Sequence, residues 1–122
     1  MTTFAIYGTF GSGQPGHANL EDAPLLERVR TASAYRLYLV DGRWPALVPA
    51  DDGVEIECEL YDFDEEHLAR LAELEPPGWA RGPLALADGR TVEAFVADRS
   101  LAARGVDVSE HGSWAAFVAG RR

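Results

Sequence analysis

The sequence predicts an α+β fold whose sheet is mixed or mostly antiparallel and can curl into a small barrel. Two Asp-Gly pairs, Asp41-Gly42 and Asp88-Gly89, separate runs of alternating apolar and polar residues and therefore indicate hairpins. One central segment, Asp64–Glu75, has helical spacing. Two short helices are expected near the C-terminus, one over 98–105 capped by Asp98 and one over 112–120 capped by Ser113, with Trp114, Phe117 and Val118 of the second packing inward. Strands in hairpins together with few helices are typical of this class.

Six segments have the pattern of strands. They are 2–7, 34–40, 44–48, 54–61, 81–87 and 90–97. Pro45 restricts its strand to an edge or an irregular role, because proline cannot donate a hydrogen bond within a sheet. Residues 23–31 leave two interpretations open: a helical turn through Leu25, Leu26 and Val29, or an edge strand over 27–31.

The strand 54–61 alternates most clearly. Its apolar face includes Cys58, so this thiol is expected to be a small buried hydrophobic group and not a nucleophile. Glu57, Glu59 and Tyr61 fall on the other face, which is expected to be solvated. A role for the two glutamates in lining a cavity is the less favoured alternative.

The helix predicted over Asp64–Glu75 has Asp64 as its N-cap and ends before two prolines. Its apolar face is expected to include Leu68, Leu71 and Ala72, with Glu75 on the same stripe and His67 pointing away. His17 and His111 are likewise expected at the surface, and the three tryptophans are expected to pack, with Trp79 able to wall a pocket.

Two interpretations of Glu75 are open. Taken alone, a carboxylate at the end of an apolar face most simply turns outward to water. The sharper hypothesis is a general acid/base whose pKa is raised by burial.

A glycine-rich segment, Gly8–Asn19, follows the first strand. Such a segment allows close backbone approach and leaves N–H groups available to a ligand. Gly11, Gly13 and Gly16 satisfy the G-x-G-x-x-G pattern. We reject dinucleotide binding, because Pro15 interrupts the expected helix and no βαβ unit follows.

Composition excludes several classes. The chain of 122 residues is expected to form a single domain, 1–122, with one modest core. Its net charge of −9 and its lack of lysine argue against nucleic acid as a partner, and no apolar run approaches the ~20 residues that span a membrane. One cysteine and no secretion signal favour the cytoplasm. The oligomeric state stays open, and a homo-oligomer is compatible with the sequence.

Three motifs resemble those of gamma-glutamylcyclotransferase-like (AIG2-like) proteins, in the same order and spacing. Tyr7-Gly8-Thr9-Phe10 resembles their Tyr-Gly-Thr/Ser-Leu signature after the first strand. The Glu-Cys-Glu-Leu-Tyr run at 57–61 resembles their Gly-Glu-Leu-Tyr strand. Leu71–Glu75 resembles the Leu-Asp-x-x-Glu segment that ends their helix. The resemblance extends from about residue 4 to residue 97 and includes the hairpin at Asp88-Gly89.

The resemblance implies a small mixed β-barrel with flanking helices and a specific reaction. Active family members convert a gamma-glutamyl compound into 5-oxoproline and a free amine, as transferases or lyases, without a metal or other cofactor. By position, Glu75 would be the catalytic glutamate. The substrate-binding residues would be Tyr7, Gly8, Thr9, Phe10 and Gly11. No cluster of His, Cys, Asp and Glu has the spacing of metal ligands.

The chain also departs from the usual family pattern. Pro76 stands where the family has glycine, and Phe10 where it has leucine. The segments 31–38, 75–77 and 112–117 resemble a branch near the accessory domain of some allophanate hydrolases, which has this fold without a comparable cyclotransferase role. The second hypothesis is therefore a non-catalytic module that binds a small molecule or assists assembly.

Overall fold

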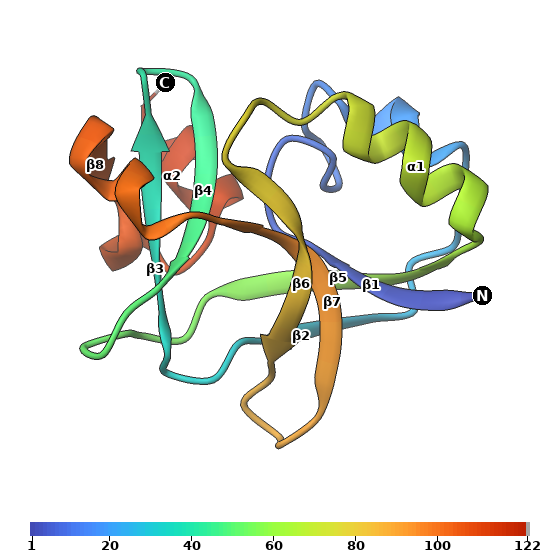
Figure 1. The fold of residues 1–122 in the computed structure, drawn as a ribbon, viewed down its shortest axis with the longest axis horizontal. Helices are drawn as coiled ribbons and strands as arrows, with labels where there is room; N and C mark the ends of the chain where they lie inside the picture. Colours follow the sequence, from blue (N-terminus) through green and yellow to red (C-terminus); the bar gives the residue numbers. More distant parts are fainter. Residues whose placement is uncertain (122) are drawn as a thin grey trace.

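The computed structural model describes residues 1–121 and contains two sheets (Figure 1). Arg122, the last residue of the predicted domain, lies outside the described residues. The strands are β1 (Thr2–Ile6), β2 (Glu27–Arg30), β3 (Tyr35–Val40), β4 (Trp44–Pro49), β5 (Glu57–Phe63), β6 (Trp79–Ala85), β7 (Thr91–Ala97) and β8 (Gly105–Asp107). The helices are α1 (Glu65–Glu73) and α2 (Trp114–Gly120), with 3₁₀ turns η1 (His17–Leu20), η2 (Arg99–Arg104) and η3 (Ser109–His111). Figure 1 shows α1 on one side of the molecule and the β3–β4 hairpin with α2 on the other.

The larger sheet is mixed, as predicted. Its strand order is β2-β5-β1-β7-β6, in which β1 pairs antiparallel with β5 and parallel with β7. The two edge strands meet just beyond their ends, where Thr31 and Leu86 form an isolated antiparallel bridge. The sheet therefore closes on itself at this end, which confirms the small barrel. Of the two interpretations of residues 23–31, the edge strand is confirmed, because β2 lies at the edge of this sheet.

The smaller sheet is built around the first predicted hairpin. β3 and β4 pair antiparallel, and both turn residues are left-handed, with φ of 52° at Asp41 and 71° at Gly42. Two successive left-handed residues are the geometry that matches the twist of the flanking strands. β4 is an edge strand in the order β4-β3-β8, which fits the restriction that Pro45 imposes.

Both faces of β5 are covered. Cys58 and Leu60 belong to the main core, whereas Tyr61 and Phe63 pack in a second apolar cluster that includes Leu68 of α1. The prediction of a solvated face was wrong for Tyr61, which is only 1% exposed. The regular strand also begins at Glu57, later than predicted, and Val54 contributes only an isolated bridge.

The central helix begins where predicted and ends two residues earlier. The Asp64 carboxylate accepts a 2.7 Å hydrogen bond from the His67 amide, which caps the helix. Leu68 and Leu71 are buried as predicted, but Ala72 is exposed.

His67 is buried, contrary to prediction. Its ring centroid lies 4.7 Å from that of Phe63, and its Nε2 lies 2.8 Å from the Asn19 carbonyl oxygen. A carbonyl can only accept, so Nε2 donates, and this bond ties α1 to η1.

The C-terminal elements follow their predicted caps. The Asp98 carboxylate accepts from the Ser100 amide at the start of η2, and Ser113 Oγ accepts from the Ala116 amide at the start of α2. Trp114 and Phe117 face inward, which confirms the predicted packing face. Within residues 1–121, no helix combines the length and apolar character needed to cross a membrane.

Candidate functional site

Glu75 lies two residues beyond the last residue of α1, at the start of the segment that leads to β6. Its amide donates a 3.1 Å hydrogen bond to the Ala72 carbonyl, so the chain makes one further tight turn before Pro76 and Pro77 stop it. The side chain is partly buried and lines a cavity. The carboxyl therefore occupies a pocket, in contrast to the simpler expectation that it turns to water.

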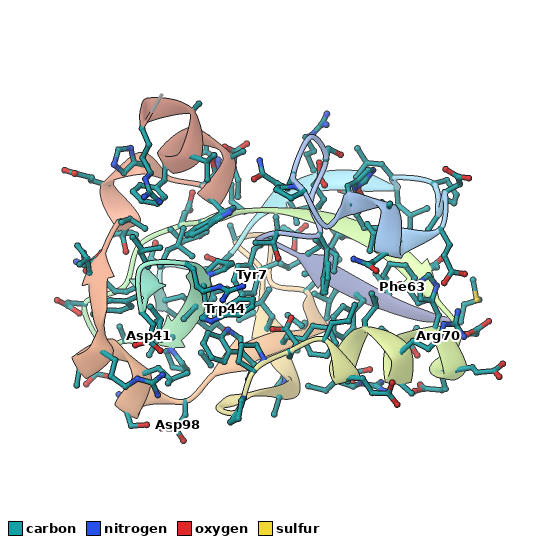
Figure 2. All side chains as sticks on the ribbon, turned by 90° about the horizontal axis from the view of Figure 1, so that it is seen from above. Tyr7, Asp41, Trp44, Phe63, Arg70 and Asp98 are labelled. Atoms are coloured by element: carbon teal, nitrogen blue, oxygen red, sulfur yellow. The ribbon has the colours of Figure 1, made fainter. Side chains whose placement is uncertain are left out.

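The cavity has a volume of about 370 Å³ and lies between three segments of the chain. The first segment is the end of β1 with the loop over residues 8–16, called the first loop below. The second is the β3–β4 turn with the first residues of β4, and the third is the connection from α1 to β6. Trp79 forms part of the wall and is held there because its Nε1 donates a 2.9 Å hydrogen bond to the Pro45 carbonyl. Figure 2 shows Tyr7 and Trp44, which both line the cavity, close together near the centre of the molecule.

Residues of the first loop that line this cavity have backbone donors left free by the described part of the chain. Gly8, Thr9 and Phe10 all line it, and their amides donate to no acceptor within residues 1–121. The loop is shaped by bonds on either side of them, since the Gly11 amide donates to the Gly8 carbonyl and the Gly16 amide to the Thr9 carbonyl. Gly8 approaches β4 so closely that a Cβ atom there would lie 2.5 Å from Pro45 Cγ. Glycine is therefore required where the loop passes β4.

Four of the five residues predicted to bind substrate thus share the cavity with Glu75. Tyr7, Gly8, Thr9 and Phe10 line it. Gly11 does not, because its amide is used within the loop and it borders a different cavity. Sequence reasoning missed Asn19, Arg43, Trp44 and Pro45 as lining residues, and no motif in the sequence singles them out.

Burial raises the pKa of Glu75 to about 7. The cause is loss of solvation, which disfavours the charged form of a carboxyl group. Within residues 1–121, the carboxyl forms no ion pair with any arginine or histidine that would oppose this effect. A carboxyl group with such a pKa exchanges protons readily at neutral pH, as a general acid/base requires.

Tyr7 connects the cavity to two sheets. Its hydroxyl donates a 2.7 Å hydrogen bond to the Phe95 carbonyl of β7 and accepts a 3.2 Å bond from the Leu47 amide of β4. Burial, with the nearby Glu75 carboxylate as the second cause, holds the pKa of this phenol well above its ordinary value. Tyr7 therefore stays neutral and positions the loop that begins at Gly8.

Tyr7→Phe is expected to lower the free energy of unfolding by about 1–3 kcal/mol, because it leaves the Phe95 carbonyl and the Leu47 amide without their partner. Chemical denaturation measures this loss. Tyr38→Phe is the matched control, because the Tyr38 hydroxyl makes no hydrogen bond in the part of the chain that the structure describes. Equal losses for the two variants would contradict the assigned role of the Tyr7 hydroxyl.

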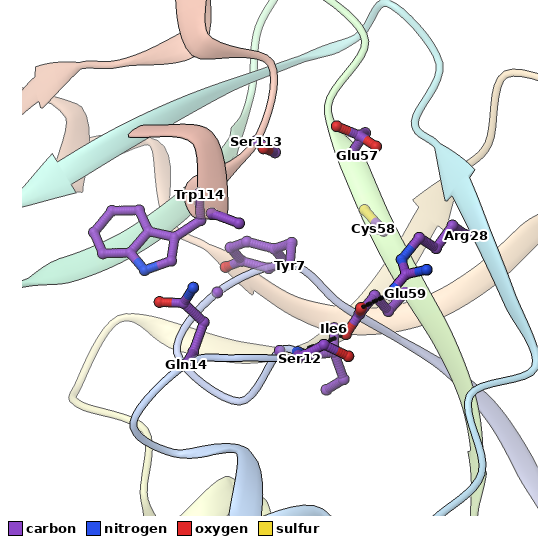
Figure 3. A pocket seen from close by; sticks show the side chains of 13 residues that line it. Ile6, Tyr7, Ser12, Gln14, Arg28, Glu57, Cys58, Glu59, Ser113 and Trp114 are labelled. Atoms are coloured by element: carbon purple, nitrogen blue, oxygen red, sulfur yellow. Dashed lines mark hydrogen bonds and ion pairs between the residues drawn. The ribbon is translucent and has the colours of Figure 1, made fainter. Parts of the chain in front are cut away.

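A second, smaller cavity of about 100 Å³ is lined by Ser12 and Gln14 of the first loop, by Glu57 and Glu59 of β5 and by Trp114 of α2 (Figure 3). Glu59 borders it and accepts hydrogen bonds from the Ser12 amide at 2.8 Å and the Tyr61 hydroxyl at 2.9 Å. Burial acts to raise the pKa of Glu59, but these hydrogen bonds, with Arg28 at 3.4 Å, together hold it below its ordinary value. The expectation of a solvated Glu59 was therefore wrong, since this carboxylate is ionised and fastens the first loop to β5.

The remaining candidate groups have structural surroundings. Burial raises the pKa of the Cys58 thiol to about 12, which fits the predicted buried hydrophobic role. His17, expected to be solvated, is partly buried, and its Nδ1 lies 2.9 Å from the Phe10 carbonyl oxygen, so it fixes the first loop. No set of three or more His, Cys, Asp or Glu side chains within residues 1–121 is arranged to hold a metal ion.

The domain match decides the family. Residues 2–119 match the model of the family described as allophanate hydrolase C-terminal domain. The chain belongs to this family. A protein of Vibrio cholerae serotype O1 named "Putative gamma-glutamylcyclotransferase" is 37% identical over 70 residues, a match that covers 57% of this chain and 58% of that protein. The chain thus matches little more than half the length of this curated relative.

Solved structures with the same fold come from both branches of the resemblance. Allophanate hydrolase of Kluyveromyces lactis has a TM-score of 0.91 at 21% identity, over 99% of this chain and 21% of that chain. A uropathogenic E. coli-specific protein has a TM-score of 0.88 at 28% identity, over 97% and 95%. An AIG2-like protein of Mus musculus has a TM-score of 0.65 at 27% identity, over 83% and 78%. The predicted resemblance and the predicted fold are both confirmed.

Proposed function

We propose that this chain is an enzyme of gamma-glutamylcyclotransferase type, which releases 5-oxoproline and a free amine from a gamma-glutamyl compound. One observation supports this proposal most directly. A carboxyl group with a pKa of about 7, Glu75, shares a cavity with Gly8, Thr9 and Phe10, whose amides donate to no acceptor within residues 1–121. A proton-transfer group together with available backbone donors is what acyl transfer requires. A cytoplasmic location belongs to the proposal and is supported by the single, buried cysteine.

The proposed reaction begins when the α-amine of the substrate attacks its own γ-carbonyl carbon. An α-amine has a pKa of roughly 8, so at neutral pH part of the substrate carries the neutral amine that can attack. Glu75, as a carboxylate, accepts the one proton that this nitrogen loses as the new C–N bond closes the five-membered ring. The negative charge that develops on the carbonyl oxygen is stabilised by amides of the first loop.

The second half of the reaction returns the same proton. The old C–N bond breaks, and the protonated Glu75 donates to the departing nitrogen, which leaves as a neutral amine. The carboxylate is then restored, so no proton is consumed overall. One group can serve as base and then acid because its pKa lies near neutral pH.

The comparisons with known proteins support the proposed reaction type but do not identify the substrate. The Vibrio cholerae relative carries the name of the activity, and the residues 7–10 and 75 that match the family motifs lie around one cavity. Incubating the protein with a panel of gamma-glutamyl amino acids and gamma-glutamyl amines, and measuring 5-oxoproline, tests the proposal directly. We expect release from at least one compound. Absence of 5-oxoproline from the whole panel would contradict it.

A second function is favoured by the family match itself. Residues 2–119 match an allophanate hydrolase domain, and the TM-score to that enzyme exceeds the score to the mouse AIG2-like protein. This supports a non-catalytic module that binds a small molecule or assists assembly. On this alternative, Glu75→Gln leaves folding and ligand binding intact, and no compound of the panel is turned over.

A further inference from the structure

We propose that Arg43, at the mouth of the Glu75 cavity, selects ligands that carry a carboxylate on the part remote from Glu75. On the proposed function, on which this assignment of the substrate rests, the preferred substrates are gamma-glutamyl amino acids. Gamma-glutamyl amines that lack a carboxylate on the amine half are disfavoured. The proposal assigns to Arg43 a role in specificity and none in proton transfer.

Arg43 is the one cationic side chain among the described residues that line the cavity. The one acidic side chain there is Glu75. The two form no ion pair, so their charged atoms lie more than 4.0 Å apart. The pKa of Glu75 is governed by burial, with no contribution from Arg43. The cavity is therefore lined by a cationic and an acidic side chain that do not neutralise each other.

Arg43 is held in place by an aromatic ring. Its guanidinium carbon lies 4.3 Å from the centroid of the Trp44 ring, and Trp44 also lines the cavity. A guanidinium stacked on a ring keeps its N–H groups at the edge, where a carboxylate can accept from them. The guanidinium is thus positioned before any ligand arrives.

Its lack of an acidic partner sets Arg43 apart from its neighbours. Arg104, beside the same hairpin turn, pairs with Asp41, and Arg36 on the adjoining strand pairs with Asp52 and Asp107. Arg43 has no such partner within residues 1–121, although the chain has 20 acidic residues and 11 arginines. An uncommitted guanidinium in an acidic protein is available to an external anion.

The position of Arg43 indicates which part of a ligand it meets. Arg43 is exposed, whereas Glu75 is partly buried, so Arg43 marks the solvent end of the cavity. Ring closure takes place at Glu75 and the first-loop amides, which places the glutamyl half inside. The departing amine must then extend toward the mouth, where its own carboxylate reaches Arg43.

A pair of substrates that differ by one carboxylate tests the proposal. Gamma-glutamyl-L-alanine and gamma-glutamyl-ethylamine share every other feature. We expect the wild type to favour the first in kcat/KM by roughly tenfold or more, which is the worth of a charge-assisted hydrogen bond. Arg43→Gln should abolish that preference, because kcat/KM for the alanine compound falls to the level of the ethylamine compound. Arg99→Gln, which removes an exposed arginine outside the cavity, is the matched control.

Binding measured on the Glu75→Gln background separates this proposal from the proposed function. Calorimetry with both compounds, on Glu75→Gln and on the Glu75→Gln, Arg43→Gln double variant, requires no turnover. A preference for the alanine compound that disappears with Arg43 supports the inference, even if the wild type releases no 5-oxoproline. Equal affinity for the two compounds, or an equal loss for both when Arg43 is replaced, would overturn it. The latter result would indicate that Arg43 reads the glutamyl carboxylate.

Discussion

Replacing Glu75 with glutamine is expected to lower kcat/KM for 5-oxoproline release by roughly 10²–10⁴-fold, the usual contribution of a general acid/base. The amide keeps the size of the side chain but can neither accept the amine proton nor return it to the leaving group. Because glutamine fits the same partly buried position, the cavity and its loop should be preserved. The loss should therefore appear mainly in kcat, with KM little changed.

Glu73→Gln provides the matched control for this measurement. Glu73 ends α1 two residues earlier and is exposed, so its replacement should leave kcat/KM within a few-fold of the wild type. A Glu75→Gln enzyme that retains full activity would contradict the role of Glu75. An equal loss in both variants would attribute the effect to the helix end and not to the carboxyl group.

The same Glu75→Gln substitution is expected to change how stability depends on pH. The pKa of Glu75 is about 7 in the folded protein and near its ordinary 4.5 when unfolded. The folded state therefore holds a proton that the unfolded state has released between these values, and its stability falls as pH rises through them. Titration of Glu75 alone should therefore cost the wild type up to about 3 kcal/mol of unfolding free energy between pH 4.5 and pH 7.5, measured relative to Glu75→Gln, at 1.36 kcal/mol per unit of pKa shift.

Glu75→Gln cannot undergo this loss of stability. Its free energy of unfolding should therefore increase relative to that of the wild type as the pH rises. Urea denaturation of both proteins at pH 5 and at pH 8 gives the difference directly. Glu73→Gln should follow the wild type at both pH values, since Glu73 is exposed. If Glu75→Gln instead became less stable than the wild type at pH 8, the carboxylate would be paired with a cation and not isolated by burial.

Local sequence patterns predicted most of the fold. The Asp-Gly pairs at 41–42 and 88–89 determine tight turns by their own backbone preferences, and both lie between paired strands. Asp64 and Ser113 cap their helices with bonds to residues three positions along, which a sequence displays directly. Such features depend on neighbours in the chain and need no knowledge of tertiary structure.

Polar side chains with distant partners were not predictable in this way. His67 is buried because the Asn19 carbonyl, 48 residues away, accepts its ring N–H. Glu59 is partly buried because the Ser12 amide, 47 residues away, donates to it. Alternation and helical spacing assign a residue to a face, but they do not reveal which segment of the chain covers that face.

The residues of the candidate site likewise include some that sequence motifs indicated and others that depend on distant parts of the chain. Glu75 and the Tyr7–Phe10 loop were found through motifs that resemble a family, and the structure brings them to one cavity. Arg43 and Trp44 reach the cavity only because the fold brings the start of β4, a strand of the smaller sheet, to the same cavity as the end of β1. Trp44 offers only its aromatic character in the sequence, which packing explains equally well, and Arg43 offers no signal. Trp79 lines the cavity as its place just beyond Glu75 suggested.

A direct titration of Glu75 tests whether burial keeps its carboxyl group protonated near neutral pH. Carboxyl carbon chemical shifts of the wild-type protein, recorded by NMR from pH 3 to pH 9, follow each glutamate separately. We expect a midpoint near 7 for Glu75, well above that of the exposed Glu73 in the same spectra. A Glu75 midpoint at or below its ordinary value of 4.5 would rule out the proposed acid/base role, because such a carboxylate would be solvated or ion-paired and unable to exchange protons at neutral pH.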